Sequence, residues 1–130
     1  MISLLVLGAA IAVTPAAPQA KWKEIGKTSV GNTVYVDPRT VKKGVDGIVT
    51  ATLRTAFTKP VATPKGPITS SRTVAMFDCG KKTVAVKENI YFHDEKTNQV
   101  FDRTAPGKPG YGPAIKGSLP DIAMAYLCSK

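Results

Sequence analysis

Two cysteines are the residues with the clearest chemistry. Cys79 and Cys128 are the only cysteines in this chain of 130 residues. In an exported protein such a pair is usually oxidised to a disulfide, and we predict this bond between them. A redox-active pair would show Cys-x-x-Cys spacing, and a structural zinc site would need more cysteine and histidine ligands. The alternative is two unrelated buried thiols.

The remaining candidates for catalysis are His93 and Asp37. His93 is the only histidine, and the sequence marks no nucleophile or metal ligand to act with it. Asp37 precedes Pro38, a pair that is typical of the start of a helical turn, where the carboxylate caps the backbone. No Gly-x-Ser-x-Gly, phosphate-binding loop or His-Glu-x-x-His motif is present. We therefore predict a non-enzymatic protein with no catalytic residue, cofactor or metal site.

The excess of positive charge suggests a binding role. The chain contains eighteen Lys and Arg residues and nine Asp and Glu residues, which gives a net charge of +9. Lys59 and Lys65, in the proline-rich stretch 59–67, are the candidate basic contacts for an acidic partner. The alternative is that dispersed lysines only keep the surface soluble. Among the aromatic residues, we expect Trp22 in the core and Tyr111 exposed in a glycine-rich loop.

The first twenty residues have the layout of a secretory signal peptide. They carry no charge, and their apolar run is followed by small residues and prolines. This run is shorter than the roughly 20 residues that a membrane-spanning helix needs. We predict a leader over residues 1–20, with the cleavage site left open, and one domain over residues 21–130, exported to the periplasm or the outer cell surface. A buried N-terminal helix is the alternative.

Six stretches carry the composition of strands: 21–27, 33–36, 48–57, 72–79, 82–92 and 99–102. Stretch 48–57 alternates most clearly, with Val49, Ala51, Leu53 and Phe57 on one face. Stretch 72–79 is apolar on both faces, which suggests a central position. The prolines of 59–67 lack the donors that a ladder needs, so we expect an exposed loop there.

The alternation of stretch 82–92 is interrupted by a charged residue. In 82–92, Val84, Val86, Ile90 and Phe92 are expected to share one face, but Glu88 interrupts them. A bulge near Glu88-Asn89, or a strand that projects beyond the sheet, would resolve this.

The last stretch, 118–128, reads as a helix. A capping pattern formed by Ser118 and Asp121 begins it, and Leu119, Ile122, Ala123, Tyr126 and Leu127 form its apolar stripe. Cys128 would point away from this stripe. Either the last turn frays, or the helix is buried on two sides.

These features, taken in order, carry a family resemblance. Trp22, the run Tyr35-Val36-Asp37-Pro38, a threonine-rich strand, Phe77-Asp78-Cys79 and the final Leu127-Cys128 together resemble the surface-adhesin protein E family of Gram-negative bacteria. The resemblance implies an antiparallel sheet of about six strands backed by a C-terminal helix, and binding of host extracellular-matrix and serum proteins. The stretch Thr104 to Gly117 departs from the family pattern because it lacks a tryptophan, and no lipid-attachment cysteine is present.

The fold class we predict is α+β, with the antiparallel sheet, one helix and one disulfide. The function we predict is an exported, non-enzymatic binding module that resembles a bacterial adhesin. Its expected partners are extracellular-matrix or serum proteins or an acidic polysaccharide, without specific nucleic-acid binding or a membrane span, and a homodimer is left open. The alternative is a periplasmic, envelope-associated interaction domain that has no host ligand.

Overall fold

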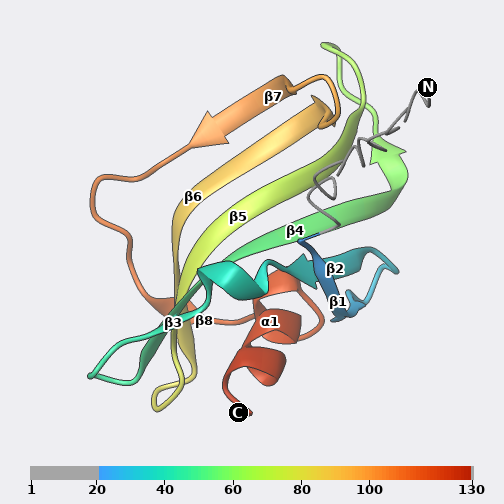
Figure 1. Ribbon diagram of the computed structural model, residues 1–130. Coiled ribbons are helices and arrows are strands. Elements are labelled where there is room, and N and C mark those ends of the chain that lie inside the picture. The colour runs from blue at the N-terminus through green and yellow to red at the C-terminus, as the bar shows by residue number, and fades with distance from the viewer. Residues whose placement is uncertain (1–20, 130) are drawn as a thin grey trace, which may run out of the picture.

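The protein is built around one curled antiparallel sheet. The computed structural model describes residues 21–129, so the predicted leader lies outside the described residues. The strands follow the order β1-β2-β4-β5-β6-β7 (Figure 1). Their bounds are β1 Lys23–Lys27, β2 Thr33–Val36, β4 Ile48–Val61, β5 Ile68–Asp78, β6 Thr83–Asp94 and β7 Gln99–Thr104. The predicted sheet of about six strands is confirmed, although α+β is a loose label for a structure that is mostly sheet.

Short elements complete the fold. The two-residue strands β3 (Lys42–Lys43) and β8 (Gly112–Pro113) pair with β4 and β6, respectively. A 3-10 turn, η1 (Pro38–Thr40), begins as predicted at Asp37, whose Oδ1 accepts a hydrogen bond from the backbone N–H of Arg39 at 3.1 Å. The helix α1 spans Leu119–Leu127.

The core lies between α1 and one face of the sheet, which we call the helix-side face. Val49, Ala51 and Leu53 of β4 are buried on this face, and in β5 Ala75 and Phe77 pair with Ala51 and Val49, respectively. The residues between them point to the opposite, outer face. The period of two therefore placed the core residues of β4 correctly, and β5 is a central strand, as its apolar composition predicted.

A bulge in β6 changes which of its residues face the helix. Val86 pairs with Ala75, but Glu88 pairs with the adjacent Val74, so that Lys87 is an extra residue in β6. Before the bulge, Val84 and Val86 lie on the helix-side face; after it, the odd-numbered residues do. The predicted bulge is confirmed, but the prediction that Ile90 and Phe92 share a face with Val84 and Val86 is wrong, because one extra residue inverts the alternation.

The hairpin between β4 and β5 is longer than its prolines suggested. β4 continues through Pro60 to Val61, which pairs with Ile68. The prediction that the whole of 59–67 is a loop is therefore wrong at its first residues. The register shifts between Ala56 and Val61, so Pro60 sits in an irregular part of the ladder, where a missing donor is tolerated.

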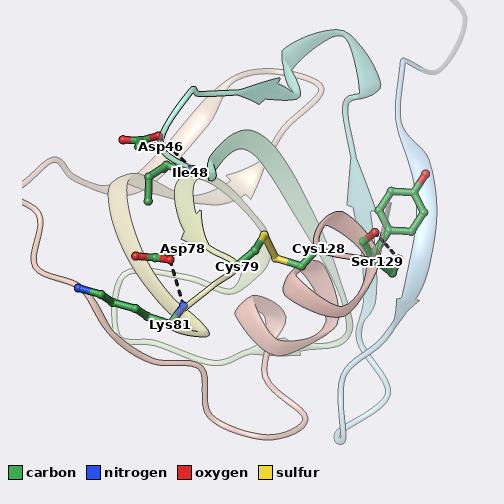
Figure 2. Close-up of a disulfide and its surroundings, with 8 residues drawn as sticks. Asp46, Ile48, Asp78, Cys79, Lys81, Cys128 and Ser129 are labelled. Carbon is green, nitrogen blue, oxygen red and sulfur yellow. Dashed lines mark hydrogen bonds between the residues drawn. A yellow bond between two sulfur atoms is a disulfide. The ribbon is translucent and has the colours of Figure 1, made fainter.

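The helix is attached to the sheet covalently and by packing. Figure 2 shows the predicted Cys79–Cys128 disulfide, which joins the residue after β5 to the residue after α1. The buried residues of α1 are Ala123, Met124 and Leu127, so the apolar stripe includes Met124, which the sequence reading omitted. Cys128 lies one turn beyond Met124, and its N–H bonds to the Met124 carbonyl at 2.9 Å. The cysteine thus reaches the sheet without fraying.

Candidate functional site

A groove lies on the helix-side face of the sheet. Figure 1 shows α1 beside β1 and β2 at one end of the sheet, while β4, β5 and β6 extend well beyond it. The groove opens where the helix begins, and its volume is about 440 Å³. Its lining residues come from the β1–β2 turn, the three long strands and the start of α1: Thr28, Ser29, Val30, Asn32, Thr55, Phe57, Ser71, Thr73, Val86, Asn89, Tyr91, Gly117, Ser118, Leu119 and Pro120.

The floor of the groove continues the core face of the same strands. Thr55 of β4 pairs with Ser71 of β5, which pairs with Tyr91 of β6. One step closer to the helix, Thr73 pairs with Asn89. On this face, apolar side chains lie under α1, and polar side chains lie past its N-terminal end. The composition of the face therefore changes where α1 stops covering the sheet.

The β6 bulge contributes one wall of the groove. Asn89 and Tyr91 have odd numbers, and only the extra residue Lys87 turns them toward the helix-side face. Tyr91 lies beside Phe57, with ring centroids 6.5 Å apart and planes tilted by 54°. Tyr91 is 37% exposed, so the two rings form a partly open aromatic wall.

The opposite wall is formed by the start of α1 and the β1–β2 turn, which are held together closely. The backbone N–H of Ser29 donates to the Gly117 carbonyl at 2.9 Å. Gly117 has φ +81°, and a Cβ atom there would lie 2.8 Å from the Cβ of Ser29. The predicted capping pattern is only partly correct: Ser118 is the N-cap, but its hydroxyl donates to the Ile115 carbonyl, while Asp121 Oδ2 accepts from the Gly117 N–H at 2.8 Å.

The polar groups of the floor are hydroxyls and one amide. Thr73 Oγ1 donates to Asn89 Oδ1 at 2.6 Å. The hydroxyl of Thr55 is buried and makes no hydrogen bond with any residue in the range 21–129. None of the lining residues is Asp, Glu, Lys, Arg or His. The groove can therefore bind through neutral hydrogen bonds and aromatic contacts.

The outer face carries the charged cluster instead. Glu95 accepts hydrogen bonds from Arg54 Nε at 2.7 Å, from Arg72 Nη2 at 2.9 Å and from the Ser70 hydroxyl at 2.6 Å. Burial raises the pKa of the Glu95 carboxyl, but these hydrogen bonds and the charge of Arg54 outweigh it and hold the pKa below its usual value. The Arg72 guanidinium also lies over the ring of Trp22, 5.6 Å from its centroid.

The residues singled out from the sequence lie outside the groove. Lys59 and Lys65 are exposed near the tip of the β4–β5 hairpin. His93 Nδ1 bonds to the Pro67 carbonyl at 2.7 Å, and its ring packs against Phe101. Trp22 is half-buried on the outer face, so its predicted place in the core is wrong, whereas Tyr111 is exposed as expected.

The polar residues of the groove floor were not predicted from the sequence. Thr55, Ser71 and Thr73 appeared as ordinary polar positions of strands, although they share a face with the core residues of β4 and β5. The positions of Asn89 and Tyr91 could have been predicted from the sequence. A bulge near Glu88-Asn89 shifts the alternation by one residue, which places both side chains on the helix-side face.

Two kinds of feature are absent from residues 21–129. No helix there is long and apolar enough to cross a membrane. Nor do any three His, Cys, Asp or Glu side chains in this range come together in a way that could hold a metal ion.

Comparison with known proteins places the fold. The chain is similar to protein E of Haemophilus influenzae: crystal form II has a TM-score of 0.57 at 14% identity, over 88% of this chain and 92% of that chain. The structure of protein E from a non-typeable strain gives 0.54 at 14% identity, over 88% and 80%. No curated protein matches the sequence. The family model described as surface-adhesin protein E matches residues 22–129, and the chain therefore belongs to the surface-adhesin protein E family.

Proposed function

We propose that this protein is an exported, non-enzymatic binding module of the adhesin type, and that it binds its ligand in the groove. The observation that carries the proposal is the groove itself: a concavity of about 440 Å³ that remains open beside the helix, in a family of surface adhesins. Its volume lies within the range of roughly 300–1,000 Å³ that is usual for ligand sites.

The architecture supports a binding surface that is formed before the ligand arrives. The floor strands β4, β5 and β6 each pair with neighbours on both sides. The disulfide ties down the C-terminal end of α1, and the hydrogen bond from Ser29 to Gly117 holds its start beside the groove. A preformed site loses less conformational entropy on binding than a mobile one. Hydroxyl, amide and aromatic side chains in the lining favour binding over proton-transfer chemistry.

Binding to immobilised host proteins tests the proposal. The oxidised protein should bind at least one member of a panel of purified extracellular-matrix and serum proteins, and Tyr91→Ala should weaken that binding. Tyr111→Ala is the matched control, because Tyr111 is also an exposed aromatic residue but does not line the groove. The adhesin proposal is wrong if no member binds above a heat-denatured control.

The second candidate is a periplasmic interaction domain without a host ligand. The charged cluster of the outer face and the net charge of +9 would serve an envelope partner equally well. Fractionation of the native cell with protease treatment of its surface separates the two: digestion on intact cells supports the adhesin, and protection until the outer membrane is opened supports the periplasmic domain.

A further inference from the structure

The groove differs in charge from the rest of the molecule. The chain carries eighteen basic and nine acidic residues, yet no Asp, Glu, Lys, Arg or His lines the groove. A site for an acidic peptide, a phosphate or a sulfated polysaccharide would place a cation against the ligand, because an unpaired buried charge is costly. The ligand that matches this lining is therefore uncharged.

The hydrogen-bonding groups of the groove both donate and accept. Thr55, Ser71 and Thr73 present hydroxyls, and Asn89 presents an amide. The Thr55 hydroxyl is enclosed in the floor and makes no hydrogen bond within residues 21–129, so the floor groups that a ligand can reach are those of Ser71, Thr73 and Asn89. A ligand rich in hydroxyls, which also donate and accept, would bond to Ser71 and to the donor and acceptor positions that Thr73 and Asn89 keep beside their mutual hydrogen bond.

The aromatic wall adds the second requirement. Phe57 and Tyr91 lie with their ring centroids 6.5 Å apart at one side of the floor, and Tyr91 is partly exposed. An aromatic face gives apolar contact area to a ligand that also has polar edges. The rings of sugars have this character, because C–H groups gather on one face while hydroxyls lie around the edge.

A peptide fits the floor less well. Extended peptides commonly bind by adding a strand to a free sheet edge, where unpaired backbone groups await a partner. At the groove, Thr55, Ser71 and Thr73 belong to strands that are already paired on both sides. Backbone pairing is thus not offered, and only side chains remain to recognise the ligand.

We infer that the groove is a saccharide site that takes a short, uncharged oligosaccharide. Its pyranose face packs against Phe57 and Tyr91, and its hydroxyls bond to Ser71, Thr73 and Asn89. This inference rests on the proposed binding function and names the class of ligand for that same groove. On a host glycoprotein, the recognised group is then a neutral glycan and not the polypeptide.

A titration followed by NMR tests the inference. The oxidised, ¹⁵N-labelled protein is screened against an array of uncharged oligosaccharides of hexoses and N-acetylhexosamines, and the strongest binder is titrated. We expect shifts centred on the amides of Ser71, Thr73, Asn89 and Tyr91, with an affinity unchanged between about 0.05 M and about 0.5 M salt, because no charge takes part. If no neutral oligosaccharide binds, or if the shifts lie outside the groove, the inference is overturned.

Two groove variants and one control sharpen the result. Ser71→Ala removes a hydroxyl and Tyr91→Ala removes part of the aromatic wall; the latter should weaken binding by at least about tenfold. Tyr111→Ala should bind as the wild type does. Thermal unfolding of each variant establishes that it is folded. Unchanged affinity in both groove variants contradicts the assignment.

The two proposals fail in different ways. If a host protein binds and removal of its glycans by glycosidase leaves binding intact, the saccharide inference is wrong and the adhesin proposal stands. If the groove binds a neutral oligosaccharide and no host protein binds, the adhesin proposal is wrong and the saccharide site stands. If a capped alanine tripeptide shifts the groove amides and no saccharide does, the ligand is a peptide and the inference is overturned.

Discussion

Glu95 shows how a single carboxylate connects the strands of the outer face. Its partners come from β4 and β5, while Glu95 itself follows β6, so one side chain bridges three segments. The folded state holds the Glu95 pKa below its ordinary value. The ionised carboxylate therefore stabilises the fold above the unfolded pKa of about 4.3, and this contribution is lost as the pH falls through the lower folded value.

Replacing Glu95 by Gln should test this contribution. At neutral pH we expect the free energy of unfolding to fall by about 1–3 kcal/mol, because charge-assisted hydrogen bonds to two arginines are lost. The difference from wild type should shrink as the pH falls below about 4. Denaturant unfolding from pH 7 to pH 3 measures it.

Glu88→Gln is the control for this change. The closest approach of Glu88 to Arg103 is 4.0 Å, and both side chains are substantially exposed. Such a surface pair contributes little to stability, so the variant should differ from wild type by less than about 1 kcal/mol. If both variants lose the same free energy of unfolding, the outer-face cluster contributes no more to stability than an exposed ion pair.

The disulfide gives a second prediction at the residue scale. The double variant Cys79→Ser/Cys128→Ser should lower the free energy of unfolding by about 4 kcal/mol, since the bond closes a loop with a sequence separation of 49. Denaturant unfolding with and without reductant measures the loss. Reductant should destabilise the wild type and leave the double variant unchanged; if it changes neither protein, the bond does not form.

At the scale of elements, the start of α1 and the β1–β2 turn depend on Gly117. Its φ of +81° is a conformation that other residues adopt at a cost, and a side chain there would meet Ser29. We predict that Gly117→Ala loses about 1–2 kcal/mol from the backbone alone, and more if the turn must move. Thermal unfolding measures the loss, and a change in groove binding would accompany it.

Gly107→Ala provides the comparison for Gly117→Ala. A Cβ atom at Gly107 would meet nothing within 4 Å, and its φ lies outside the left-handed region. This variant should unfold within about 0.5 kcal/mol of wild type. If both substitutions cost the same, the contact between Gly117 and the turn does not position the helix.

The elements were predictable from the sequence to different degrees. Strand β4 and the central position of β5 followed from alternation and from apolar residues on both faces, which are local properties. The predicted stripe of α1 was mostly correct, because Ala123 and Leu127 are buried and Leu119 and Tyr126 pack against the core. Met124 was missing from it, although a helical face includes all of its apolar residues. The groove could not be predicted, because its polar floor becomes a site only where the helix stops covering the sheet, and that end point is a tertiary property.

At the scale of the whole molecule, the positive charge is separate from the groove. Lys59 and Lys65 are exposed near the β4–β5 tip, whereas Lys81 and Lys82 are exposed at the β5–β6 turn. Lysines act together only at close range, because the Debye length is about 8 Å at physiological salt. A cluster at one tip would bind an acidic polysaccharide, and evenly spread lysines would release it at lower salt.

Elution from heparin tests which arrangement applies. If the tip is a binding patch, the wild type should remain bound near about 0.15 M salt, and Lys59→Glu/Lys65→Glu should elute earlier than Lys81→Glu/Lys82→Glu. Equal elution of the two variants would identify the lysines as a solvated surface. Neither pair of changes should affect binding in the uncharged groove.

The sequence separation of the two cysteines also determines when the disulfide can form during synthesis. Cys79 emerges together with the central strand, but its partner is 49 positions behind it. During that interval β6, β7 and α1 are still to come, and the only thiol available to Cys79 belongs to another molecule. An oxidant that acts early would therefore produce mixed disulfides, whereas one that acts after Cys128 emerges would seal a finished sheet. Correct oxidation thus reports that the chain has been synthesised through α1, so the bond marks an assembled sheet and helix as well as stabilising them.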